Sequence, residues 1–147
     1  LLNLQIVMYK AIKYFFICLS LLLPAVSFAQ EMSKEEIEAE KKFREGIDSI
    51  IEKYESDLKL ESWQVFYLDS ILTHDFQALR DEMKSMGKSG VENPDLYIEV
   101  QDKWQEQIYN SLSKVFDEEQ WARYLKSGAG KEKKARDKRK AKKEGIK

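Results

Sequence analysis

The sequence has little of what small proteins use for covalent staples or metal centres. Among its 147 residues there is one cysteine, Cys18, and one histidine, His74. Cys18 lies within an apolar run that we expect to be removed, which leaves no thiol for a disulfide, a thiolate metal site or a nucleophile. A lone histidine cannot complete a closed zinc site. We therefore expect no metal site, and a fold that depends on packing alone.

A recognisable catalytic group is also lacking. No glycine-rich phosphate loop occurs, and no convincing Ser/His/Asp arrangement can be assembled around His74. Acidic neighbours such as Glu35-Glu36 and Glu118-Glu119 point in different directions on a helix, so a solvated face explains them better than an acid/base pair. The sequence thus predicts no catalytic residue, no cofactor and no enzyme activity.

Proline and glycine are scarce, with two and six residues, and in the second half of the chain they cluster at residues 87–94 and 127–130. No segment alternates with the period of two that is typical of a strand. Long stretches instead repeat apolar residues at spacings of three and four. This pattern predicts an all-α domain of four helices over residues 30–130.

The N-terminal segment has the pattern of an export signal. Two lysines precede an apolar run over residues 14–23, and small Ser27 and Ala29 fit the rule for cleavage before Gln30. The run is shorter than the roughly 20 residues that span a bilayer, which disfavours a membrane anchor. We expect residues 1–29 to be a cleaved signal peptide.

An export signal normally opens with its basic residues, so we take Met8 as the expected start and residues 1–7 as lying upstream of it. Cleavage would place the mature chain in the periplasm, or beyond it if the protein is secreted.

Capping residues mark the predicted helix starts. Ser33 and Glu36 form a capping box, with Met32 stapled onto Ile37, and Asn93-Pro94 places a cap before a proline in the first turn. The predicted helices run from about Ser33 to Asp57, from Ser62 to Met86, from Asn93-Pro94 towards Val115, and from Asp117 to the glycines at 127–130.

The second helix has apolar residues on two sides. Its main stripe is expected to form the core and comprises Val65, Leu68, Leu72, Phe76, Leu79, Met83 and Met86. Trp63, Tyr67 and Ile71 lie on nearly the opposite side, and a helix with two apolar sides needs two partners. These three residues are our candidate surface for a client or for a second copy. The alternative is that the monomer buries them, as we expect for Trp104 and Trp121.

Charge is distributed unevenly along the chain. Residues 131–147 carry ten basic and three acidic residues, whereas residues 30–130 carry 13 basic and 23 acidic residues. Because the basic segment has almost nothing apolar to bury, we expect a disordered tail. It has no aromatics that could stack on bases, so a solubilising role that assists acidic or envelope-bound partners is favoured over binding to nucleic acid.

Two short motifs share one pattern, in which an apolar residue and a polar residue are followed three positions later by glutamine. They are Leu60-Glu61-Ser62-Trp63-Gln64 and Phe116-Asp117-Glu118-Glu119-Gln120. In each, the glutamine side chain can reach back to the amide of the capping residue. Each motif should therefore set the angle at which one helix leaves the preceding one.

The paired motifs resemble the Leu-Thr-x-x-Gln motif of the Spy/CpxP family of periplasmic proteins. The resemblance spans about residues 33–126 and carries over to Leu60, Gln64, Phe116 and Gln120. Both threonines are replaced, by Glu61 and by Asp117. Asp117 is a good cap and Glu61 is not, which leaves Ser62 as an alternative cap for the second helix.

The resemblance implies a thin, curved, helical hairpin-type fold that dimerises in antiparallel fashion. It also implies an ATP-independent chaperone that holds unfolded or partly folded clients on an amphipathic helical surface. The alternative is a regulatory or structural module of the envelope-stress response that binds one specific partner protein. The sequence does not separate these two functions.

Overall fold

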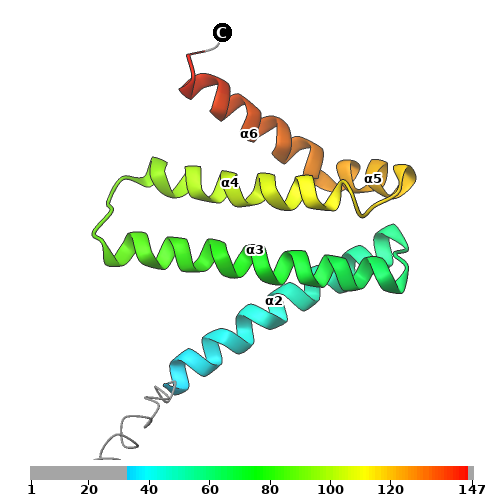
Figure 1. The fold of residues 1–147 in the computed structure, drawn as a ribbon, viewed down its shortest axis with the longest axis horizontal. Helices are drawn as coiled ribbons and strands as arrows, with labels where there is room; N and C mark the ends of the chain where they lie inside the picture. The colour runs from blue at the N-terminus through cyan, green and yellow to red at the C-terminus, as the bar shows by residue number, and fades with distance from the viewer. Residues whose placement is uncertain (1–32, 146–147) are drawn as a thin grey trace, which may run out of the picture. The chain divides into compact units, whose positions relative to one another are not determined.

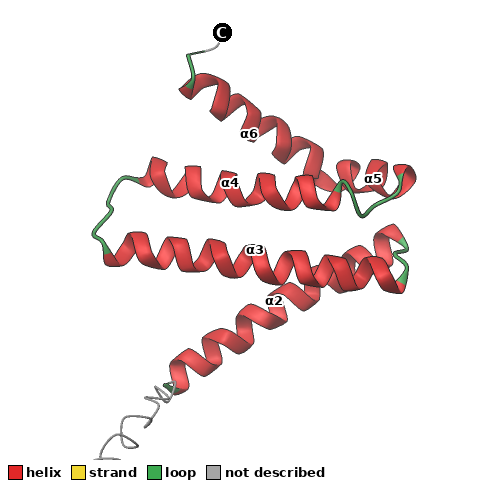
Figure 2. Cartoon of the chain, viewed as in Figure 1, coloured by secondary structure: helices red, strands yellow, loops and turns green. Residues whose placement is uncertain are grey.

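The computed structural model describes residues 33–145, and all of its regular structure is helical (Figures 1 and 2). The elements are α2 (Lys34–Leu58), α3 (Ser62–Lys88), α4 (Pro94–Leu112), α5 (Glu118–Tyr124), the π-helical turn η1 (Leu125–Ala129) and α6 (Gly130–Lys143). The all-α prediction is confirmed. The expected signal peptide, the start at Met8 and the Met32 staple lie outside the described residues.

None of the helices between residues 33 and 145 combines the length and the apolar character that crossing a membrane requires.

The local signals at the helix starts are confirmed. The Ser33 hydroxyl accepts a hydrogen bond from the Glu36 amide at 3.1 Å, and the Glu36 carboxylate accepts one from the Ser33 amide at 2.9 Å. At α4 the Asn93 side chain accepts from the Asp95 amide at 3.0 Å, with Pro94 in the first turn. These bonds satisfy amides that have no partner within the helix, so the starts are read correctly from sequence.

Helices α3 and α4 lie side by side as an antiparallel hairpin, and α2 crosses α3 (Figure 1). Side chains join α2 to α3: Arg44 Nη2 lies 2.8 Å from the Asp69 carboxylate, and the Arg80 guanidinium lies 4.0 Å from the centre of the Phe43 ring. Apolar side chains from α2, α3, α4, α5 and the connection between α4 and α5 form one core, whose buried members are Ile47, Ile51, Leu58, Leu68, Leu72, Ile108, Leu112, Phe116 and Tyr124.

The core is concentrated at the end of the hairpin where α3 begins. Of the predicted stripe on α3, Leu68 and Leu72 are buried, whereas Met83 and Met86 near its other end are only half-buried. Trp104 and Trp121 are both half-buried; Trp121 packs against the core as expected, whereas Trp104 does not belong to it. Trp104 Nε1 donates to the Glu82 carboxylate at 2.7 Å, so its polar edge is satisfied at the surface of the hairpin.

The basic C-terminal segment differs from the disordered tail expected over residues 131–147. Helical structure does not end at residues 127–130; it continues through η1 into α6. Gly128 has φ 120°, a backbone angle that a residue with a side chain rarely adopts. The chain kinks at this position. Basic side chains of α6 then form ion pairs with acidic residues of α4. The expectation of a disordered tail considered only apolar side chains, so it left this attraction out.

Candidate functional site

The second motif forms a complete capping box at the start of α5. The Asp117 carboxylate accepts from the Gln120 amide at 2.8 Å, and Gln120 Oε1 accepts from the Asp117 amide at 3.0 Å. Both partners are close in sequence, so this arrangement follows from the local pattern alone.

The first motif uses Glu61, not Ser62, as the cap of α3. Gln64 Oε1 accepts from the Glu61 amide at 2.9 Å, which is the same contact that Gln120 makes with Asp117. The Glu61 carboxylate accepts a hydrogen bond from Trp63 Nε1 at 2.8 Å. The alternative register with Ser62 as cap is therefore wrong, because Ser62 is already the first residue of the helix.

The two motif glutamines bind each other across the interior, although they are 56 positions apart. Gln64 Nε2 donates to Gln120 Oε1 at 2.6 Å, and Gln120 Nε2 donates to Gln64 Oε1 at 2.9 Å. Both side chains are almost completely buried, at 3% and 5% exposure. A buried amide pair of this kind excludes water and fixes the separation of the two helix starts.

The remaining amide hydrogens of the pair reach the backbone of the opposite joint. Gln64 Nε2 donates to the Val115 carbonyl at 2.9 Å, and Gln120 Nε2 makes a longer contact of 3.5 Å to the Lys59 carbonyl. Val115 and Lys59 each directly precede the apolar first residue of a motif. The contacts therefore repeat with the two motifs exchanged, and every donor and acceptor of both amides has a partner.

The α2–α3 joint is also held by a side chain of α5. Lys59 has φ 55°, in the left-handed region that often ends a helix, and the Leu60 amide donates to the Glu55 carbonyl at 3.1 Å. Arg123 Nη2 donates to the Leu58 carbonyl at 3.0 Å, which places a cation at the C-terminus of α2. Through Gln64 and Gln120, the two motifs thus hold the α2–α3 joint and the α4–α5 joint together, and we call this arrangement the lock.

Next to this lock lies a cluster of aromatic rings around Tyr124. Tyr54 and Phe116 pack edge-on against Tyr124 at centroid distances of 5.4 and 5.6 Å, and Tyr109 packs edge-on against Trp121 at 4.8 Å. Burial raises the pKa of the Tyr124 phenol well above its ordinary value, and raises that of Tyr54 as well. Both phenols therefore stay neutral, as suits a packing role.

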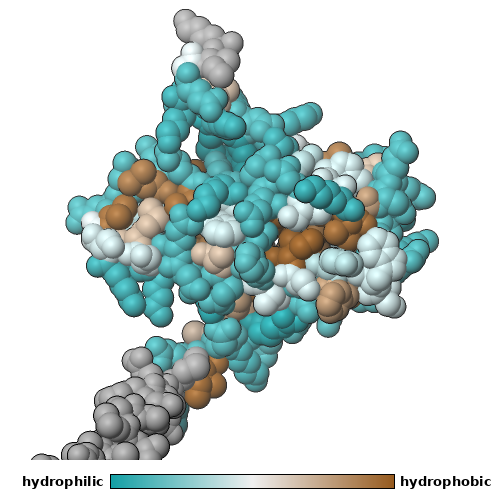
Figure 3. All heavy atoms as spheres, in the orientation of Figure 1, coloured by the Kyte–Doolittle hydropathy of each residue, from teal (hydrophilic) through white to brown (hydrophobic). Residues whose placement is uncertain are grey.

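A separate group of aromatic rings stands exposed on the first turns of α3. Trp63, Phe66 and Tyr67 are 51%, 67% and 52% exposed, and we call them the aromatic surface. Trp63 and Phe66 each pack edge-on against Tyr67, at 6.2 and 5.8 Å between ring centroids. Figure 3 shows apolar and weakly polar residues gathered over the end of the hairpin where α3 begins.

Two of the three residues that the sequence singles out lie in this surface. Ile71 does not: it is half-buried and packs against the core. Phe66 is the member that the sequence analysis missed, because it belongs to neither of the two stripes assigned to this helix. Its spacing of three from Trp63 was the available signal, since residues three apart are neighbours on a helix.

His74 and Asp75 on α3 have structural partners. His74 Nδ1 lies 2.7 Å from the Asp75 carboxylate, which is buried and also accepts from Gln107 Nε2 on α4 at 2.9 Å. Asp75 therefore joins α3 to α4. Within residues 33–145 no group of three or more histidine, cysteine or acidic side chains is arranged to hold a metal ion.

A scan against protein-family models finds no match for this chain, and searches of curated proteins and of solved structures find none either.

Proposed function

We propose that this chain is a protein-binding module that holds apolar segments of other polypeptides on its aromatic surface, without nucleotide. In this proposal it is an exported, periplasmic, divergent member of the Spy/CpxP type, with no catalytic role. The observation that carries the proposal is the exposure of three adjacent aromatic rings on a helix whose start is locked by Gln64 and Gln120.

The rigidity of the site supports this function. Exposed, clustered aromatics are typical of binding surfaces, and a soluble chain rarely leaves them together without a partner. The rings project from the first two turns of α3, directly after the locked joint, so presenting them costs little conformational freedom. The excess of acidic over basic residues in 30–130 favours solubility while these rings stay accessible.

The size of the surface favours weak and reversible contact. Three half-exposed aromatic side chains offer on the order of 300 Å². Covering that area contributes about 7 kcal/mol, which is comparable to the roughly 4–15 kcal/mol lost on association. A client that gains little beyond these contacts would bind transiently, which is what a holding chaperone without an energy source requires.

The second candidate is a module that binds one specific envelope partner through the same rings. Trp63 and Phe66 each pack edge-on against Tyr67 on one helix. A helix that presents such a ring cluster also suits binding in a single complementary groove of one partner. Breadth of activity separates the two functions. A chaperone suppresses aggregation of several unrelated unfolded proteins, whereas a specific module protects or binds only one.

The decisive experiment compares Trp63→Ser/Tyr67→Ser with the control Leu96→Ser/Ile98→Ser in aggregation assays on three unrelated reduced or heated proteins. Leu96 and Ile98 are exposed apolar residues near the start of α4, so the control removes apolar surface elsewhere. We expect the first variant to lose most protection and the control to keep it. Equal loss in both, or a large loss of helix content in the first variant, would reject the aromatic surface as the binding site.

A further inference from the structure

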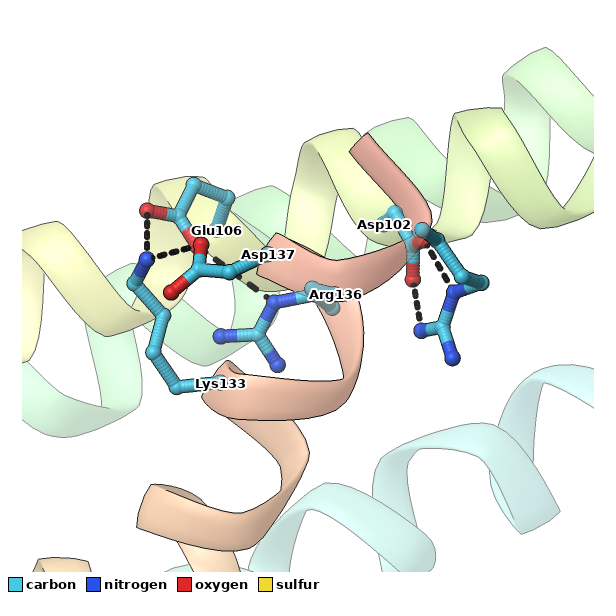
Figure 4. Close-up of polar contacts among 6 residues, drawn as sticks. Asp102, Glu106, Lys133, Arg136 and Asp137 are labelled. Atoms are coloured by element: carbon cyan, nitrogen blue, oxygen red, sulfur yellow. Dashed lines mark hydrogen bonds and ion pairs between the residues drawn. The ribbon is translucent and has the colours of Figure 1, made fainter. Parts of the chain in front are cut away.

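Helix α6 has positive charge on two opposite sides, and only one side is used within the molecule. Its inner side faces α4, where Arg139 makes two hydrogen bonds to the Asp102 carboxylate at 2.6 and 2.7 Å. Near the end of α6, Lys143 lies 2.6 Å from the Glu99 carboxylate. The Glu106 carboxylate pairs with two further cations, Lys133 at 3.3 Å and Arg136 at 3.4 Å. Figure 4 shows the contacts of Asp102 and of Glu106 bridging the two helices.

The outer side of α6 carries four exposed lysines, which we call the lysine stripe: Lys131, Lys134, Lys138 and Lys142, the last of which also borders the groove between α6 and α4. Their steps of 3, 4 and 4 residues place them on one face of the helix over a length of about 16 Å. Among residues 33–145 no carboxylate oxygen is paired with any of their Nζ atoms within the 4 Å of an ion pair. The stripe is therefore a row of uncompensated charge.

The acidic residues of this segment do not interrupt the stripe. At 100° per residue, Glu132, Asp137 and Glu144 project outside the sector that the four lysines occupy. Asp137 is moreover paired with Lys133 on the inner side. The ion pairs to α4 thus orient the helix so that its net positive face points away from the acidic hairpin.

We propose that the lysine stripe docks the protein peripherally on an anionic phospholipid surface. The side chains of α6 other than its charged residues are only alanines, so the helix has no anchor to insert between lipid chains. It also has no aromatic ring to stack on a base, which disfavours a nucleic acid. A lysine side chain is flexible and carries a point charge. A straight row of lysines on an exposed helix face can therefore contact a flat layer of phosphates without requiring one fixed geometry.

The strength of such docking can be bounded. Each lysine close to an anionic surface strengthens binding about fivefold, and the attraction is confined to about 10 Å at 0.1 M salt. Four lysines therefore give reversible, salt-sensitive attachment. This inference does not depend on client binding, because it concerns α6 and not the aromatic surface on α3.

The experiment measures sedimentation of the full chain with vesicles of phosphatidylglycerol and phosphatidylcholine, against vesicles of phosphatidylcholine alone. The second vesicle accounts for any binding through the apolar residues 14–23. Two double variants with the same net charge are compared: Lys134→Gln/Lys138→Gln on the stripe, and Lys133→Gln/Lys143→Gln on the inner side. Circular dichroism checks that both keep their helix content.

We expect the stripe variant to lose about 25-fold of the binding that depends on the anionic lipid, and the inner variant to lose less than about fivefold, because its lysines are already neutralised by carboxylates. Equal losses in both variants would show that net charge alone acts and would overturn the proposal. So would wild-type binding that does not depend on phosphatidylglycerol, or tighter binding to a DNA duplex at equal phosphate concentration and salt.

Discussion

At the scale of single residues, Gln64 and Gln120 are the side chains on which the fold depends most. Each side chain makes three kinds of hydrogen bond: to the capping residue of its own helix, to the other glutamine, and to a backbone carbonyl of the opposite joint. A buried amide that loses its partner costs its full desolvation, about 1–3 kcal/mol, and a lost cap adds about 1 kcal/mol. The pair therefore should behave as a unit.

A double-mutant cycle tests this interdependence. We expect Gln64→Ala and Gln120→Ala each to lower the free energy of unfolding by about 2–3 kcal/mol, and the double variant to lose about 1–2 kcal/mol less than the sum. Urea unfolding followed by circular dichroism measures both quantities. The exposed Gln101→Ala on α4 is the control, with a change within about 0.5 kcal/mol. Strict additivity of the two core substitutions would contradict the reciprocal pair.

At the scale of elements, α6 is unlike the other helices because ion pairs rather than apolar packing attach it. Its buried residue is Arg136, and its cations contact carboxylates at Glu99, Asp102 and Glu106 on α4. Most of these side chains are partly exposed, and exposed pairs are individually worth about 0–1 kcal/mol. The attachment of α6 should consequently be the weakest contact between helices in this part of the chain.

Salt should release α6 before anything else unfolds. At 1 M NaCl the screening length falls to about 3 Å, so we expect amide hydrogens of residues 131–143 to exchange faster while those of α3 around Leu68 and Leu72 stay protected. Hydrogen exchange read by mass spectrometry gives both values. Asp102→Asn/Glu106→Gln should produce the same change at low salt. Undiminished protection of α6 under both conditions would mean that apolar packing holds it.

At the scale of the whole molecule, the core is small and lies at one end. Among residues 33–145, nine apolar side chains are buried, and the apolar residues in the half of the hairpin farthest from the motifs are half-buried or, like Leu96 and Ile98, exposed. Chains with so little buried surface are marginal unless a partner adds to it. A second copy that covers the exposed aromatic rings would supply apolar contact of the kind that the monomer lacks.

Dimerisation is the matching prediction. We expect light scattering during size-exclusion chromatography to give twice the mass of one chain at micromolar concentration, and the melting temperature to rise with protein concentration, because association stabilises only the folded state. If the aromatic surface is the dimer contact, Trp63→Ser/Tyr67→Ser yields the monomer mass. A monomer at every concentration would rule out the dimer and leave these rings free for clients.

Much of the helical layout is local and could be read from the sequence. Ser33, Asn93 and Asp117 accept hydrogen bonds from amides only two or three residues away, so the pattern of neighbours contains the whole interaction. The glycines at 127–130 were less informative: they predicted the end of the last helix, whereas the chain only kinks at Gly128 and continues into α6. Helix content, helix starts and the positions of the joints followed from the order of the residues.

Only the tertiary structure decided what meets across long separations. The pattern showed that Gln64 and Gln120 cap helices, but not that their amides pair, because the pairing depends on how α2 and α4 lead the chain back. It also could not show that Phe66 is exposed while Ile71 is covered, or that the basic segment forms a helix against α4. Burial and ion pairing between distant segments depend on the angles between helices, and those angles are properties of the packed molecule.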